Sequence, residues 1–252
     1  MGKQARVRAR EIRHAQAIAA RRTANRTRWV LAAGGFVIAG LLVAIVAVVA
    51  TSGSKNDAPT ANDRAAAVMP ANASTGGAIL IGRPEAAVKV EIYLDYMCPF
   101  CGRFEQANSA DIDSLVKAGQ IRVELHPLAF LDRMSNGTRY STRTANAIAT
   151  VADRAPTSLL AFNTALFGAQ PAEGSTGLTD DQIAALAVQA GVPAQVASAF
   201  TDRTFEPWVA AATDAALKAG ITGTPTVKIN GVVLRDLYAA GAFKRAVEAV
   251  GD

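Results

Sequence analysis

The chain contains one long apolar segment, followed at a distance by a region in which apolar and polar residues alternate. Residues 29–50 carry no charged side chain over 22 positions. A helix of about 20 apolar residues crosses the ~30 Å hydrocarbon core of a bilayer, so this segment predicts a transmembrane helix. Residues 51–77 are rich in Ser, Gly, Asn, Ala and Pro and predict a flexible tether. The alternating pattern begins near Ala78 and predicts a folded domain over residues 78–252.

The first part of this domain has the pattern of strands joined by a helix. Short apolar runs predict strands at 78–81, 88–96 and 121–125. Apolar residues occupy both faces in the middle of the second run, which predicts a central position in the sheet. A helix-forming run over 102–118 joins the second and third strands and ends near Gly119. This order predicts a βαβ unit with a right-handed crossover.

The second part of the domain has a helical period before strand patterns return. Residues 135–220 predict a helical insert with helices at 136–153, 159–167, 179–190, 193–205 and 208–219. Thr179 and Gln182 form a capping-box pattern at the start of the third of these helices, and Gly191 ends it. Residues 226–234 predict a hairpin with an Asn-Gly turn, and 238–250 a final helix. The pattern therefore predicts an α/β fold in which a helical insert interrupts the sheet.

The charges are distributed unevenly along the chain. Residues 1–28 contain nine Lys/Arg and one acid, a balance of +8, whereas residues from 51 onward contain 17 Lys/Arg and 20 Asp/Glu, a balance of −3. The folded part therefore has little basis for binding nucleic acid. Arginines before the apolar segment predict that residues 1–28 are a basic cytoplasmic tail and that the domain is extracytoplasmic. The tail also fits an amphipathic helix on anionic lipid or a nucleic-acid arm, which we consider less favoured.

The apolar segment has one competing interpretation, a cleaved signal peptide. Val48 and Ala50 fit a small-residue cleavage site. However, the apolar run is longer than the usual signal core of about 7–15 residues, and the basic region before it is long. No cysteine follows the segment directly, which excludes a lipoprotein. We therefore expect a retained single-pass anchor in the cell membrane.

The candidate chemistry comes from the only two cysteines, Cys98 and Cys101, which lie where a predicted strand ends and a helix begins. Side chains at i and i+3 of a first helical turn share one face, with Cα atoms about 5 Å apart, which suits a disulfide. The helix N-terminus favours a thiolate, and Pro99 is tolerated in a first turn. This pattern predicts thiol–disulfide exchange, with Cys98 as an exposed nucleophile and Cys101 as the more buried resolving thiol.

Two other interpretations of the cysteine pair are weaker. A structural disulfide closing so short a loop contributes only about 2 kcal/mol. A zinc site needs four ligands, and besides the two cysteines the chain has only His14 and His126. We therefore expect no metal and no cofactor other than the redox-active disulfide Cys98–Cys101.

Several motifs together resemble a known family. They are Asp95-Tyr96-Met97-Cys98-Pro99-Phe100-Cys101-Gly102, Gly223-Thr224-Pro225-Thr226, the helical insert between them, His126-Pro127-Leu128 and Leu131-Asp132-Arg133. The chain resembles the DsbA-like branch of the thioredoxin superfamily over residues 78–252, and most closely its membrane-anchored actinobacterial members. The resemblance implies a thioredoxin-like fold with an inserted helical domain and disulfide formation in exported proteins. It also implies that Pro225 is a cis-proline facing the cysteines and that Thr224 offers backbone hydrogen bonds to an extended substrate, although the same residues fit an ordinary turn.

The sequence departs from the family at three places. Phe100 stands where the best-known enterobacterial relative has His, so the resemblance does not extend to a strongly oxidising potential. Ile92 stands where many members have a buried acid, which leaves Glu91 or Asp95 as the candidate proton shuttle, with Glu91 alternatively a surface charge. The insert lacks the second cysteine pair of some actinobacterial relatives. Pro99, Phe100 and the loop around Pro225 are expected to offer an apolar surface to unfolded clients, unless Phe100 is only a tolerated spacer.

The motif does not distinguish an oxidase from a reductase or an isomerase, because all three use the same residues. Isomerases of the superfamily usually carry an N-terminal dimerisation domain, whereas here a low-complexity tether precedes the first strand, which favours a monomeric oxidase. Such an oxidase needs a membrane re-oxidase of the DsbB or vitamin-K-epoxide-reductase type. The alternative from another class is a membrane-tethered binding module with a vestigial redox pair.

Overall fold

The computed structural model describes residues 67–251. The predicted tail, the predicted transmembrane helix at 29–50 and most of the predicted tether lie outside these residues. Within the described part, no helix is both long enough and apolar enough to span a bilayer. The final residues of the predicted tether contact the domain, since Ala71 N donates to Asp153 Oδ1 at 2.9 Å and Leu80 N donates to Asn72 O at 2.7 Å. Ala71 and Asn72 are thus part of the folded domain.

The sheet has five strands in the order β1-β3-β2-β4-β5. The strands are β1 (Ile79–Gly82), β2 (Val88–Leu94), β3 (Ile121–Pro127), β4 (Thr226–Ile229) and β5 (Val232–Val233). β2 runs parallel to β3 and antiparallel to β4, while β1 is antiparallel to β3. The predicted central position of β2 and the predicted βαβ unit, closed by helix α2 (Pro99–Lys117), are confirmed.

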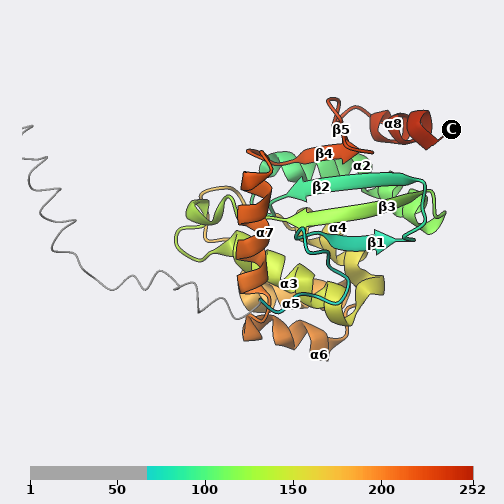
Figure 1. The fold of residues 1–252 in the computed structure, drawn as a ribbon. Coiled ribbons are helices and arrows are strands. Elements are labelled where there is room, and N and C mark those ends of the chain that lie inside the picture. The colour runs from blue at the N-terminus through green and yellow to red at the C-terminus, as the bar shows by residue number, and fades with distance from the viewer. Residues whose placement is uncertain (1–66, 252) are drawn as a thin grey trace, which may run out of the picture. The chain divides into compact units, whose positions relative to one another are not determined.

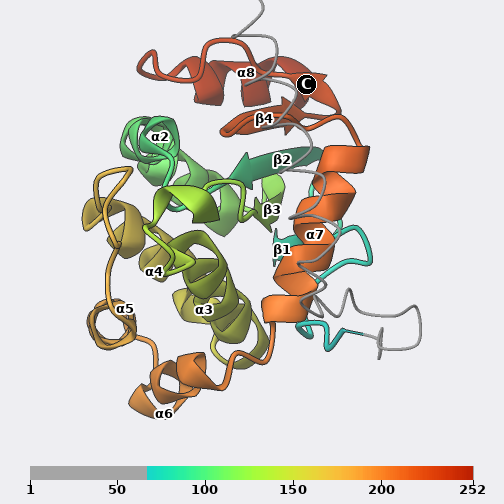
Figure 2. The same cartoon turned by 90° about the vertical axis from the view of Figure 1, so that its left-hand side faces the viewer.

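The helical insert separates β3 from β4 in the chain, as predicted. It contains α3 (Tyr140–Arg154), α4 (Leu159–Gly168), α5 (Asp180–Gln189), α6 (Ala194–Ala197) and α7 (Glu206–Lys218), with short 3-10 turns between them. Figure 2 shows α7 on one face of the sheet and α2, α3 and α4 on the other. The last helix, α8 (Ala242–Gly251), follows the β4–β5 hairpin and contacts α2 and β2 (Figure 1).

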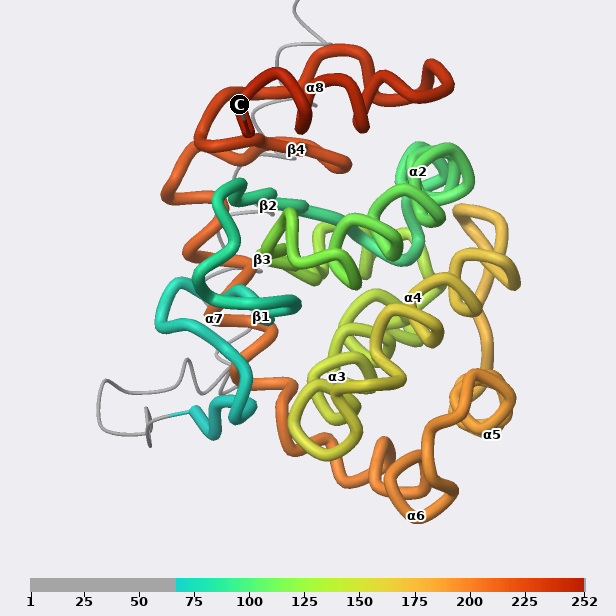
Figure 3. The backbone as a smooth tube through the Cα atoms, turned by 90° about the vertical axis from the view of Figure 1, so that its right-hand side faces the viewer, coloured from blue at the N-terminus to red at the C-terminus, as the bar shows by residue number. Residues whose placement is uncertain are grey.

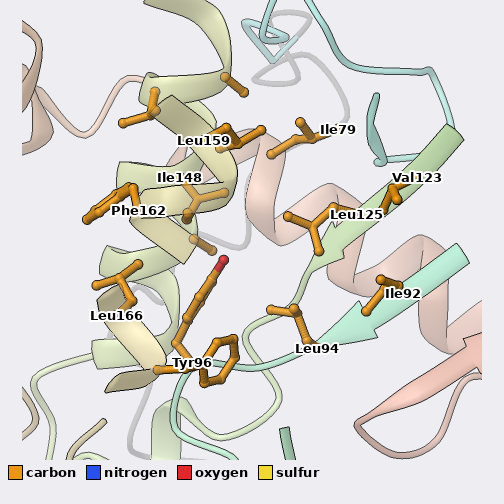
Figure 4. Close-up of a cluster of buried hydrophobic side chains, with 14 of the residues drawn as sticks. Ile79, Ile92, Leu94, Tyr96, Val123, Leu125, Ile148, Leu159, Phe162 and Leu166 are labelled. Carbon is orange, nitrogen blue, oxygen red and sulfur yellow. The ribbon is translucent and has the colours of Figure 1, made fainter. Parts of the chain in front are cut away.

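The main core lies between the sheet and the helices α3 and α4 (Figure 4). Alternate residues of β2, namely Val90, Ile92 and Leu94, face this core and are at most 3% exposed. Tyr93, on the opposite face of the same strand, is buried in a smaller cluster with Leu128, Ala216 and Ile221. Both faces of β2 are therefore covered, which fixes the strand that leads into the two cysteines.

Three predicted helix boundaries are wrong. α3 begins at Tyr140 rather than 136, because Asn136, Gly137 and Arg139 all have positive φ values. The single helix predicted at 193–205 is instead α6 followed by a 3-10 turn (Ser198–Asp202), which Arg203 ends with a φ of 55°. α8 begins at Ala242, after Gly241 with a φ of 68°.

Candidate redox site

The two cysteines lie at the start of α2, where the sequence predicts them. Cys98 is the N-cap residue, Pro99 follows at the first helical position, and Cys101 N donates to Cys98 O at 3.0 Å. Both cysteines are free thiols. The first turn of the helix therefore places the two cysteine side chains on one side of α2.

The burial of Cys98 differs from the prediction. Cys98 was expected to be exposed, but the residue is only 4% exposed, and Cys101 is 1% exposed. Segments far from Cys98 in the chain lie around it, because Leu131 and the loop at Thr224 line the same groove and Thr224 O lies 3.2 Å from Cys98 Sγ. The neighbouring Phe100, by contrast, is 50% exposed. Cys98 therefore lies on a groove rather than at an open helix end.

The environment gives the two thiols opposite acidities. The hydrogen bond from Cys101 lowers the pKa of Cys98 to about 6, and the side chain of Thr224 and the backbone N–H groups of Cys101 and Phe100 act in the same direction against burial. Burial raises the pKa of Cys101 well above its ordinary value, and the neighbouring Cys98 raises it further. At neutral pH the site therefore holds a thiolate on Cys98 and a proton on Cys101, which supports the predicted roles.

The loop between α7 and β4 brings Thr224 to the cysteines. The peptide bond between Thr224 and Pro225 is cis, the isomer that the resemblance implies. The Sγ of Cys98 lies 3.2 Å from the carbonyl oxygen of Thr224. Residues 126 positions apart in the chain thus meet at the nucleophile.

A groove of about 510 Å³ opens beside Cys98. Its lining includes the apolar residues Phe100, Phe130, Leu131 and Leu217 and the charged residues Arg133 and Glu173. Arg103 lies next to this surface, with its guanidinium carbon 4.6 Å from the ring centroid of Phe100 and 4.9 Å from that of Tyr238. This stacking holds the exposed Phe100 ring in place.

Of the two acids proposed as proton shuttles, only Asp95 lies beside the cysteines. Its backbone carbonyl accepts from Cys98 N at 3.0 Å, and its fully buried carboxylate accepts hydrogen bonds from Met97 N, Leu131 N and Ser141 Oγ at 2.6–2.9 Å. Burial raises the pKa of Asp95 to about 6 despite these hydrogen bonds.

Glu91 lies among other charges of the sheet. Ligand atoms of Glu91, Glu124 and His126 lie within 4.8 Å of one another, which is the spacing of a three-ligand metal site. However, Lys89 Nζ lies 3.3 Å from Glu91 Oε2 and 3.6 Å from Glu124 Oε2. The ammonium group thus already neutralises the two carboxylates that a cation would need.

Two residues near the cysteines were missed in the sequence. Glu105 is 7% exposed, accepts a hydrogen bond from Thr164 Oγ1 at 2.7 Å, and has a pKa that burial raises. Its position four residues after Cys101, on the buried side of α2, was a signal that could have identified it. Gln170 donates hydrogen bonds to the carbonyls of Tyr96 and Cys98, and no sequence pattern pointed to it.

The described domain is similar to known proteins. A family model described as thioredoxin matches residues 74–249. MdbA, a thiol–disulfide oxidoreductase from Actinomyces oris, superposes with a TM-score of 0.64 at 25% identity, covering 72% of this chain and 89% of that one. The reduced form of the disulfide bond oxidoreductase DsbG from Mycobacterium tuberculosis gives 0.62 at 27% identity, covering 71% and 89%. Oxidised DsbA from M. tuberculosis gives 0.60 at 28% identity, covering 69% and 93%.

A further similarity concerns part of a much longer protein. The serine/threonine-protein kinase PknE of M. tuberculosis is 35% identical over 156 residues, which is 60% of this chain and 27% of the kinase. The match thus spans about a quarter of the kinase.

Proposed function

Because this chain belongs to the thioredoxin family and is a DsbA-like thiol–disulfide oxidoreductase, we propose that it donates disulfides to exported proteins through Cys98 and Cys101. The observation that carries this proposal is the opposite acidity of the two thiols. A fold that stabilises the Cys98 thiolate stabilises the reduced enzyme, and a stabilised reduced form makes the disulfide form a stronger oxidant.

The reaction proceeds in two exchanges. A client thiolate attacks the Sγ of Cys98 in the enzyme disulfide, forming a mixed disulfide, and the sulfur of Cys101 leaves and takes up a proton. A second client thiolate then attacks the client sulfur of the mixed disulfide, and Cys98 leaves as a thiolate. The client loses two electrons and gains a disulfide, while the enzyme becomes a dithiol. The low pKa of Cys98 makes it a good leaving group in the second step.

Asp95 is the candidate for moving the proton to Cys101. A proton carrier works best when its pKa is near the working pH, and the pKa of Asp95 is raised to about 6. Its carboxylate is also held next to the redox turn by Ser141 and two backbone N–H groups. Glu91 is the weaker candidate, because it is paired with Lys89.

The groove beside Cys98 is the proposed client site. Phe100, Phe130 and Leu217 offer apolar contacts to an unfolded chain, while Pro99 and the Thr224–Pro225 loop border the nucleophile. In the mixed disulfide the Sγ of Cys98 is bonded to the client, so the carbonyl of Thr224 is available to an extended client backbone. This arrangement favours extended segments that carry apolar residues next to the reacting cysteine.

The wider setting is part of the same proposal. The domain works outside the cytoplasm, as a monomer attached to the membrane by residues 29–50, and a membrane re-oxidase of the DsbB or vitamin-K-epoxide-reductase type restores its disulfide. The basic residues before that segment support this orientation. Removal of residues 1–50 is expected to move the protein from the membrane fraction to the soluble fraction of the cells that produce it, whereas an unchanged distribution contradicts the anchor.

The redox equilibrium of the Cys98–Cys101 pair with glutathione tests the direction of the reaction. A potential of about −120 to −180 mV supports an oxidase or isomerase, whereas a potential near about −270 mV indicates a reductase. Cys98→Ser is expected to abolish oxidation of a dithiol peptide, while Cys101→Ser is expected to accumulate mixed disulfides. If Cys98→Ser kept full function with its partners, the chain would instead be a binding module.

A further inference from the structure

The loop that follows α4 sends one polar side chain to the redox turn. Gln170 Nε2 donates hydrogen bonds to the carbonyl oxygen of Tyr96 at 3.0 Å and to that of Cys98 at 2.9 Å. Both N–H bonds of the amide are thus used on the segment that joins β2 to α2. Figure 3 shows this part of the insert, after α4, beside the start of α2.

The Cys98 carbonyl is the one on which the first turn of α2 is built. It accepts from Cys101 N at 3.0 Å and from Gly102 N at 3.3 Å. The N–H groups of Phe100 and Cys101 in that turn are among the groups that stabilise charge on the Cys98 sulfur. Any group that fixes this carbonyl therefore also fixes the donors that face the sulfur.

The contact between Gln170 and the redox turn depends on a glycine at position 102. A Cβ at Gly102 would lie 2.3 Å from Gln170 Oε1, which is far closer than two nonbonded atoms approach. The absence of a side chain at Gly102 thus leaves the space that the Gln170 amide occupies. The glycine directly after the second cysteine and the glutamine of the insert form a matched pair.

The same part of the insert holds the redox turn at a second point. Tyr96, whose carbonyl Gln170 binds, donates its hydroxyl hydrogen to Asn163 Oδ1 at 2.7 Å and stacks on Phe167 with ring centroids 4.9 Å apart. Asn163 and Phe167 belong to α4. Gln170 therefore acts from a segment that is itself anchored to the turn.

We propose that Gln170 is a positioning residue of the redox site, whose amide fixes the carbonyls of Tyr96 and Cys98 so that the first turn of α2 stabilises the Cys98 thiolate. The inference rests on the proposed thiol–disulfide exchange and adds to it a route by which the helical insert sets the reactivity of the cysteine pair. Without the amide, the first-turn donors are held less firmly, the thiolate is less stable and the disulfide is a weaker oxidant.

The first test compares Gln170→Ala and Gln170→Met with Gln106→Ala. Gln106 is a matched control because it is an exposed glutamine of α2 that lines the same pocket between α2 and the segment after α4 as Gln170. The rate of Cys98 alkylation by iodoacetamide is measured against pH in the reduced protein. Both Gln170 variants are expected to move the midpoint upward by about half to one pH unit. The equilibrium constant for thiol–disulfide exchange with glutathione is expected to shift about threefold to fivefold in favour of the oxidised enzyme. The control is expected to match the wild type.

A double-mutant cycle with Gly102→Ala separates this role from general packing. In the wild-type background the new methyl group displaces the Gln170 amide, so the alkylation midpoint is expected to rise as it does in Gln170→Ala. In the Gln170→Ala background the methyl group enters vacant space and is expected to have no further effect on Cys98.

The inference would be overturned if both Gln170 variants, or Gln170→Met alone, had the same alkylation midpoint as the wild type. It would also be overturned if Gly102→Ala raised the alkylation midpoint in the Gln170→Ala background. These results leave the proposed function intact. A wild-type enzyme that does not exchange with glutathione removes the proposed function, and with it the basis of the inference.

Discussion

At the scale of single residues, position within the fold sets the chemistry more strongly than residue type. Cys98 and Cys101 are identical side chains three positions apart, yet their pKa values move in opposite directions. Cys98 receives hydrogen bonds from its surroundings, whereas Cys101 lies deeper and loses solvation. The helix N-terminus alone would favour a thiolate at both positions, so the asymmetry comes from the hydrogen bond that Cys101 donates to Cys98 and from the burial of Cys101.

His126 gives a pH-dependent prediction at the same scale. Burial lowers its pKa to about 4, with Lys228 and Lys89 acting in the same direction against Glu91. Because the folded pKa lies below the unfolded value of about 6.5, His126 contributes stability above pH 6.5 that is lost as the pH falls toward 4. Urea unfolding of the wild type and His126→Asn is therefore expected to give a difference in unfolding free energy that is about 3 kcal/mol larger at pH 7 than at pH 4.

The substitution also removes the stacking of His126 on Tyr93, whose ring centroids lie 4.0 Å apart. Loss of this stacking lowers the unfolding free energy by the same amount at every pH and does not change how the unfolding free energy depends on pH. A difference that is the same at both pH values would show that His126 becomes protonated without unfolding the domain, and would contradict the prediction.

The redox pair could be predicted from sequence because its signal is local. Spacing and a strand-to-helix junction were enough to identify Cys98 and Cys101. Cys101 is more buried than Cys98, as predicted. The groove beside Cys98 could not be predicted in this way, because no local pattern connects Leu131 and Thr224, which line it, to the helix start. Gln170 was missed for the same reason, since its hydrogen-bond partners lie more than 70 residues earlier in the chain.

At the scale of elements, helix ends were predicted correctly where their hydrogen bonds are local. The capping box of α5 is present, with Gln182 N donating to Thr179 Oγ1 and Thr179 N donating to Gln182 Oε1. The start of α3 was misplaced because its caps come from farther back. Tyr140 N donates to Ser135 Oγ and Thr142 N donates to Asp132 Oδ1, across a turn that a helical period does not reveal.

The capping box of α5 can be tested by Thr179→Ala. The substitution leaves an N–H group of the first turn without its side-chain acceptor, and the expected loss in unfolding free energy is about 1 kcal/mol by urea denaturation. Thr176→Ala is a matched control, because Thr176 is exposed and no described hydrogen bond uses its hydroxyl group. Equal losses of unfolding free energy in the two variants would mean that the capping box does not stabilise α5.

At the scale of the whole molecule, the redox turn lies where the sheet and the helical insert are joined. Asp95, directly after β2, accepts a hydrogen bond from Ser141 of α3, and Tyr96 bonds to Asn163 of α4. Several members of the core shown in Figure 4 come from the same strands and helices. A change in the charge of Cys98 is therefore linked to the stability of the entire domain rather than to a separable loop.

This linkage predicts how the reduced protein responds to pH. The folded pKa of Cys98, about 6, is below its ordinary value, so the thiolate contributes stability that is present at high pH and is lost as the pH falls through 6. Relative to Cys98→Ser, the reduced wild type is expected to gain about 2–3 kcal/mol in unfolding free energy between pH 5 and pH 8, measured by urea denaturation. Other groups titrate alike in both proteins and cancel in the comparison. If the unfolding free energies of the wild type and Cys98→Ser changed with pH in parallel, folding would not stabilise the thiolate. The Cys98–Cys101 disulfide would then gain no oxidising power from this thiolate, because the free energy that favours the folded thiolate is the same free energy that favours reduction of the disulfide by a dithiol.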